Sequence, residues 1–158
     1  MTDDKMIKRA TDVYDSLCEM LETNNWKFER IPSANIVTFK TVGEDLPMDF
    51  IIKVDAEKQL VRLLSPISFE FPEDKRMEGA VVTSFANYNL ADGSFDYDVK
   101  TGKTVFRMTT SFIDSLISSE LLHFMVGCAC YTVDEYNDKF FMVSKGMLSL
   151  DDFIKNYA

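Results

Sequence analysis

The stretch Asp49–Ser65, DFIIKVDAEKQLVRLLS, decides the fold of this chain. It holds two runs of β-branched and aliphatic residues, a composition that favours strands. The polar DAEK between them is short enough to connect antiparallel neighbours. Ile51 and Ile52 are adjacent, so their side chains point to opposite faces of the strand. We therefore predict a hairpin whose first strand is apolar on both faces and lies centrally in a sheet.

Further strands and a helix precede this hairpin. Residues 26–31 and 35–42 are rich in aromatic and β-branched residues and are separated by short turn-forming segments, as strands are. Before them, apolar residues recur every three or four positions from Met6 onward, which predicts a helix over residues 3–23. Thr2 is the expected cap of this helix.

A helix and a second hairpin follow. Residues 71–90 return to helical spacing, although Gly79 lowers the helical propensity there. The apolar positions that carry this spacing are Met77, Val81, Phe85 (or Ser84) and Tyr88. Residues 94–112 then alternate around a KTGK turn, in which Gly102 supplies the positive φ of a tight loop.

Two helices complete the chain. A long helix is predicted from Ser118 or Ser119 to about Val143, with Gly146 as its C-terminal stop. A short helix begins at Ser149, where the spacing to the following acidic residues resembles a capping box. Together the elements predict a single domain over residues 1–158 of the α+β class. It has an antiparallel sheet with helices packed on it, in the order α-β3(or 4)-α-β2-α.

The overall charge restricts the kinds of partner. The formal net charge is −9 and no cluster of Lys and Arg is visible, so we expect no nucleic-acid partner. An anionic membrane surface would be repelled, and no run approaches the ~20 apolar residues of a membrane span, so we expect no membrane partner. The odd number of cysteines, three, favours reduced thiols and a cytoplasmic location.

The segment Leu121–Thr132, LLHFMVGCACYT, contains the chain's one histidine and two of its three cysteines. On a helix Cys128 and Cys130 point about 200° apart, and His123 lies about 10.5 Å along the axis from Cys130. They cannot share a zinc ion, whose ligand bonds are only about 2.0–2.3 Å long. The thiols lie among Phe, Met and Val, where a thiol stays protonated. We expect all three side chains to serve interior packing.

Two stretches resemble functional motifs, but their residues do not match the spacing or the residue types that those motifs require. TGKT at 101–104 lacks the glycine that a phosphate-binding loop needs five residues before Gly102. A calcium loop beginning at Asp96 and Asp98 would have Lys100 as its third ligand, so we expect the two aspartates on the solvated side of an edge strand. No hydrolase or nucleotide-binding motif is present. We predict no enzyme: no catalytic residues, no cofactor and no metal site.

The long helix has a core stripe and an unusual opposite face. The stripe comprises Leu122, Val126, Ala129, Val133, Tyr136, Phe140 and Val143. The opposite face begins with Phe124, Gly127 and Tyr131 and becomes acidic only further along. A helix that is apolar all round must be covered on both sides. We predict that Phe124, Gly127 and Tyr131 form a homodimer interface; coverage by loops or by the N-terminal helix is the alternative.

The order of these elements resembles that of the YbjN family of bacterial sensory transduction regulators. The likeness includes the hairpin quoted above, the Phe71-Pro72-Glu73 step into a helix, the strand–turn–strand FDYDVKTGKTVFR, and the long helix carrying Asp134-Glu135-Tyr136. It covers about residues 35–150. The resemblance implies an α+β fold similar to type III secretion chaperones. It also implies a protein that binds other proteins, commonly as a homodimer, without catalysis.

Three functions remain open at this point. The first, which the resemblance favours, is a cytoplasmic, regulatory or chaperone-like protein that binds another protein of unknown identity. The second is a secretion chaperone for a specific effector. The third is a small-ligand binder or enzyme with a pocket lined by Trp26, Tyr88, Phe95 or Tyr97, although the spacing of these aromatics fits a core.

Overall fold

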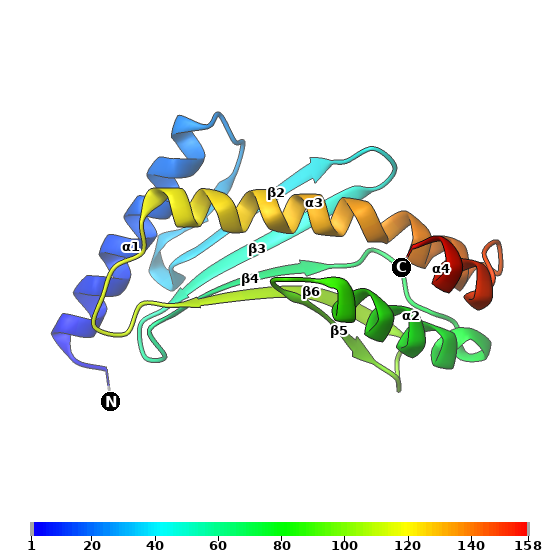
Figure 1. Cartoon of the computed structure of the whole chain (residues 1–158). Helices are drawn as coiled ribbons and strands as arrows, with labels where there is room; N and C mark the ends of the chain where they lie inside the picture. Colours follow the sequence, from blue (N-terminus) through cyan, green and yellow to red (C-terminus); the bar gives the residue numbers. More distant parts are fainter. Residues whose placement is uncertain (1, 158) are drawn as a thin grey trace.

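The computed structural model describes residues 2–157 and packs helices against a sheet (Figure 1). The strands are β1 (Glu29–Ile31), β2 (Ile36–Val42), β3 (Pro47–Asp55), β4 (Leu60–Pro66), β5 (Ser94–Asp98) and β6 (Lys103–Ser111). The helices are α1 (Asp4–Thr23), α2 (Arg76–Asn89), α3 (Ser119–Ser144) and α4 (Leu150–Asn156), with 3-10 turns at Pro32–Ala34 and Glu73–Lys75. In the described residues the strand order is β1-β2-β3-β4-β6-β5, and every neighbouring pair is antiparallel. The predicted α+β class, with helices packed on an antiparallel sheet, is confirmed.

The β3–β4 hairpin lies in the interior of this sheet, as its sequence predicts. Ile52 is buried opposite Leu63 on the face that the helices cover. Ile51 lies opposite Leu64 on the other face, where both are half-buried. The hairpin is therefore apolar on both faces, but the helices cover only one of them.

The core lies between the covered face of the sheet and the helices. In Figure 1, α3 runs across the sheet, α1 crosses near its beginning, and α2 and α4 gather near its end. The predicted stripe of α3 is buried along its whole length. Around the fully buried Phe140 lie the rings of Phe71, Phe95, Tyr136 and Phe153, with centroids 5.0–6.4 Å away. This aromatic cluster joins α3 and α4 to the sheet.

The helix caps follow the predicted chemistry, with one correction. At α3 and α4, Ser118 and Ser149 each accept a hydrogen bond from a backbone N–H three residues on. At α1 the cap is Asp3, not Thr2, because the Asp3 carboxylate accepts a hydrogen bond from the Met6 N–H at 2.8 Å. Aspartate is at least as good a cap as threonine, so α1 begins one residue later than predicted.

Helix α2 turns inward a different face from the one that its large apolar residues indicate. Met77, Val81 and Tyr88 are exposed, Tyr88 by 90%. The buried positions are instead Gly79, Val82, Thr83 and Ala86. Small side chains let the helix approach β5 and α3 closely, and this close packing outweighs the burial of the larger residues.

Gly79 lies at the closest point of this packing. A Cβ at this position would stand 2.4 Å from Tyr97 Oη and 2.7 Å from the ring of Phe71. The glycine that weakens the helical pattern in the sequence is therefore the residue that admits two aromatic rings.

The variant Gly79→Ala is expected to lower the free energy of unfolding by about 1–3 kcal/mol, because the added methyl overpacks the contact with Phe71 and Tyr97. Helix propensity alone would raise the free energy of unfolding by about 1 kcal/mol, because alanine is a better helix former than glycine. Urea unfolding followed by circular dichroism measures the difference. Ser84→Ala, at an exposed position of the same helix, is the control and should be neutral or slightly stabilising. A more stable Gly79→Ala variant would contradict the close packing.

Candidate interaction surfaces

The outward face of α3 is apolar and uncovered over its N-terminal half. The helix is continuous through Gly127. Phe124 is 54% exposed and Tyr131 is 72% exposed. A Cβ on Gly127 would have none of the described side chains within 4 Å. The three residues predicted as an interface therefore share one open face, which the loops of this chain and α1 leave uncovered.

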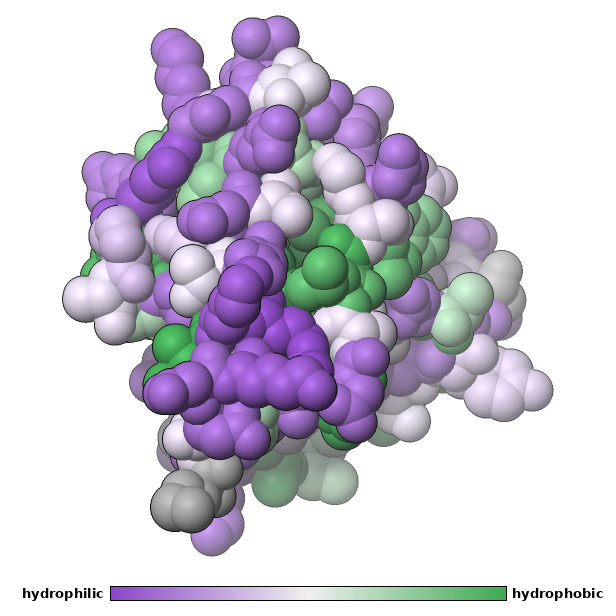
Figure 2. Space-filling model, turned by 90° about the vertical axis from the view of Figure 1, so that its left-hand side faces the viewer, coloured by the Kyte–Doolittle hydropathy of each residue, from purple (hydrophilic) through white to green (hydrophobic). Residues whose placement is uncertain are grey.

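Exposed apolar side chains also occur in the loop that leads into α3. Ile113 and Leu116 in this loop are 62% and 61% exposed. Arg9 of α1 holds the loop through an ion pair with Asp114 at 3.4 Å. Figure 2 shows this end of the molecule, where hydrophilic side chains surround a small apolar area. No helix within residues 2–157 combines the length and the apolar character needed to span a bilayer.

The histidine and the thiols of α3 do not converge. His123 is exposed, which corrects the prediction that it packs in the interior; it lies about one turn before Gly127 on the open side of the helix. Cys128 and Cys130 are half-buried against the core, in agreement with a packing role. Burial, with the Asp134 carboxylate nearby, raises the pKa of Cys130 to about 12, so this thiol stays protonated at neutral pH. Within the described chain, no three His, Cys, Asp or Glu side chains are grouped so that they could hold a metal ion.

The aromatic residues considered as pocket lining lie in separate places. Phe95 is buried in the core, and Tyr97 donates a hydrogen bond to a backbone carbonyl of α2 at 2.7 Å. Trp26 packs on Phe39 with a centroid distance of 5.0 Å, while Tyr88 extends into solvent. In the part of the chain that the structure describes, these four residues do not line a common cavity.

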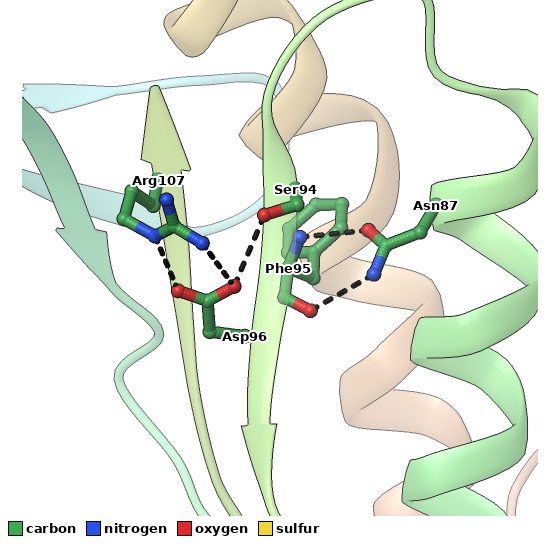
Figure 3. Close-up of polar contacts among 5 residues, drawn as sticks. All are labelled: Asn87, Ser94, Phe95, Asp96 and Arg107. Atoms are coloured by element: carbon green, nitrogen blue, oxygen red, sulfur yellow. Dashed lines mark hydrogen bonds and ion pairs between the residues drawn. The ribbon is translucent and has the colours of Figure 1, made fainter. Parts of the chain in front are cut away.

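Strand β5 is an edge of the sheet, and Asn87 of α2 covers it (Figure 3). The Asn87 amide group donates to the Phe95 carbonyl at 3.0 Å, and its oxygen accepts from the Phe95 N–H at 2.7 Å. One side chain thus provides both hydrogen bonds that a neighbouring strand would make at Phe95. An exposed edge strand invites pairing with other chains, and Asn87 opposes such pairing at Phe95.

Asp96 and Asp98 lie on the solvated side of this edge strand, as predicted. Asp96 accepts hydrogen bonds from the Arg107 guanidinium, the shorter at 2.6 Å, and these bonds lower the pKa of the Asp96 carboxyl (Figure 3). Asp98 accepts from the Lys100 N–H and the Thr101 hydroxyl, each at 2.9 Å, and this lowers its pKa too. Both carboxylates are therefore occupied in holding the β5–β6 hairpin.

The opposite edge of the sheet is less protected. The short β1 pairs with only the first part of β2. Where β1 begins, a hollow of about 620 Å³ opens on the sheet; its lining includes Lys27, Phe28, Lys40, Ile51 and Pro66. A smaller hollow of about 420 Å³ borders Tyr131 and is also lined by Leu90, Tyr136 and Tyr157. Sequence reasoning missed both hollows and the role of Asn87, because each depends on how separate elements pack against one another.

Comparison with protein families gives one match, which covers most of the chain. The matching family model is YbjN, described as "Putative bacterial sensory transduction regulator", and it covers residues 14–142. A comparison with curated proteins found no match.

Solved structures with a similar fold include the crystal structure of YbjN from E. coli. It has a TM-score of 0.56 and 14% identity, with 80% of this chain and 92% of that chain covered. A chain of the ExsC–ExsE complex has a TM-score of 0.54 and 11% identity, with coverage of 80% and 94%. A chain of the HopA1–SchA chaperone–effector complex has a TM-score of 0.48 and 13% identity, with coverage of 77% and 91%. At such identities the first two comparisons establish a shared fold.

The variant Asn87→Ala is expected to lower the free energy of unfolding by about 1–3 kcal/mol, because it leaves the N–H and C=O of Phe95 without partners. Hydrogen exchange at the Phe95 amide should accelerate in the same variant. Asn89→Ala, which removes a single exposed bond to the Phe85 carbonyl, is the matched control and should cost less. Equal stability of the two variants would contradict the role assigned to Asn87.

The Asp96–Arg107 pair is expected to stabilise the fold in a pH-dependent way. Because the folded state lowers the pKa of Asp96, the contribution is present above the unfolded value of about 3.9 and is lost as the pH falls through the folded value. The pair is about half exposed, so Asp96→Asn should cost at most about 1 kcal/mol at pH 7. Denaturant unfolding of both proteins from pH 7 into acid should show the difference shrinking. If the stability difference stayed constant with pH, the Asp96–Arg107 pair would not be its cause. The same would follow if Asp45→Asn, at an exposed position, lowered the stability equally.

Proposed function

The chain belongs to the YbjN family, and from this premise we propose that it acts in the cytoplasm, without catalysis, by binding another protein. The role is regulatory or chaperone-like. Family membership and a fold shared with the ExsC–ExsE complex support this class of function. The narrower role of a secretion chaperone for one effector has the fold alone in its favour.

The observation that carries the proposal is the exposed apolar face of α3. The inward stripe of this helix is buried in the core, whereas Phe124 and Tyr131 are exposed on its other side. Apolar surface of this kind on a folded protein marks a site of interaction.

The arrangement of this face favours a second copy of the chain as one partner. Gly127 has open space above it, so another helix can approach its backbone closely. Phe124 and Tyr131 lie three residues before and four residues after this glycine. If two copies of α3 cross antiparallel at Gly127, Phe124 of each copy faces Tyr131 of the other. Such a contact is self-complementary, as a two-fold symmetric dimer requires.

The variant Tyr131→Asp is expected to convert a dimer into a monomer, because it places a charge within the apolar contact, opposite Phe124 of the other copy. Light scattering coupled to size-exclusion chromatography should give twice the 18.1 kDa chain mass for the wild type and the single mass for the variant. Tyr88→Asp, which changes an exposed tyrosine on α2 in the same way, should stay dimeric.

A second variant separates association from folding. Gly127→Leu adds a good helix former where there is open space, so the monomer should be as stable as the wild type or more stable. The bulky side chain should nevertheless keep two copies of α3 apart. A monomeric wild type, or dimers of unchanged mass in both α3 variants, would refute the homodimer.

A further inference from the structure

The face of the sheet opposite the helices has an unusual charge arrangement. Lys40 pairs with Asp49 at 3.6 Å, and Arg107 pairs with Asp96 at 2.6 Å. The remaining central cations, Lys53 and Arg62, lie directly opposite each other on β3 and β4.

This pair of cations is not neutralised within the chain. Among residues 2–157, no carboxylate lies within 4 Å of the charged groups of Lys53 or Arg62. Like charges directly opposite each other destabilise a sheet. Of the acidic side chains on the same face of β3, Asp49 pairs with Lys40, and Asp55 accepts a hydrogen bond from the Lys58 N–H. The arrangement suits an anionic group from outside the chain.

An apolar row lies beside the two cations on the same face. Ile51 and Leu64 are cross-strand neighbours, half-buried, and each is two residues from one of the cations, about 6.6 Å along its strand. Val105 of β6 continues this half-buried surface. The hollow of about 620 Å³ extends it past Phe28 to Pro66, and two lysines and two carboxylates also line this hollow: Lys27, Lys40, Glu29 and Asp49. The open face therefore combines apolar surface with two unpaired positive charges.

We propose that this face binds an acidic, extended segment of a partner protein. An apolar side chain of the segment occupies the hollow over Ile51, and its carboxylates neutralise Lys53 and Arg62. The distance from β2 to β6 is about 14 Å, which four or five extended residues span. This inference rests on the proposed protein-binding function, but it concerns the open face of the sheet and not the outward face of α3.

Other occupants fit less well. A second copy in two-fold contact would bring its own Lys53 and Arg62 towards the same pair. A nucleic acid would be repelled by the net charge of −9 and would find Asp49 and Asp96 on the same face. A segment with one or two carboxylates and an apolar anchor satisfies the charges and the hollow together.

The test uses a phage-displayed library of random dodecapeptides, selected on the full chain. Enriched peptides are expected to contain Asp or Glu next to Leu, Ile or Phe. A fluorescein-labelled copy of the most enriched peptide should bind several-fold more weakly when the salt is raised from 50 to 500 mM. The variant Lys53→Glu should weaken this binding by at least about tenfold, because it replaces attraction by repulsion.

The same variant provides its own folding control. Lys53→Glu creates an opposite-charge pair with Arg62, so the unbound protein should melt at the same temperature or higher. Lys5→Glu on α1, an exposed lysine whose replacement changes the net charge equally, should bind the peptide as the wild type does.

Several results would overturn the proposal. These are a selection that enriches no peptide, enriched peptides without acidic residues, binding that Lys53→Glu leaves intact, and displacement of the peptide by heparin at equal charge concentration. Peptide binding does not depend on the dimer, so the Tyr131→Asp variant should bind the peptide as the wild type does. Failure of the homodimer proposal can therefore be told apart from failure of this one.

Discussion

The structure depends on the packing of one long helix against one face of one sheet. Strands with alternating side chains can hide only one face behind a single layer of helices. The α3 stripe from Leu122 to Val143 fills that layer, and the Phe140 cluster joins it to the strands and to α4. Helices α1 and α2 both contact α3, and each also contacts the sheet, α1 at β3 and α2 at β5. The residues that α3 does not cover become the surfaces available to partners.

These surfaces differ in chemistry. The outward face of α3 is apolar around Gly127, and the outward face of α2 displays Met77, Val81 and Tyr88. The open side of the sheet mixes half-buried aliphatic residues with two unpaired cations. At the β5 edge of the sheet, the side chain of Asn87 bonds both backbone groups of Phe95. The uncovered faces are the ones on which the proposed contacts depend, and Asn87 opposes strand pairing at Phe95.

Several polar side chains of α2 and the β5–β6 hairpin make hydrogen bonds that hold the fold together. Asp96, Asp98 and Asn87 hold the β5–β6 hairpin, and the Tyr97 hydroxyl is bonded to the backbone of α2. Burial keeps the thiol of Cys130 protonated.

The sequence by itself determined the order and type of the elements, because hydrophobic period, turn residues and caps act over a few neighbouring residues. It also identified the stripe of α3 and the opposite residues Phe124, Gly127 and Tyr131, since one helix defines both faces. It was wrong about the inward face of α2, where Gly79 and Ala86 are buried and Tyr88 is exposed, and about His123. Only the tertiary structure decided these points, together with the cap at β5 and the opposed Lys53 and Arg62. Each depends on strand register or on how separate elements pack against one another, which the spacing of residues within one element does not encode.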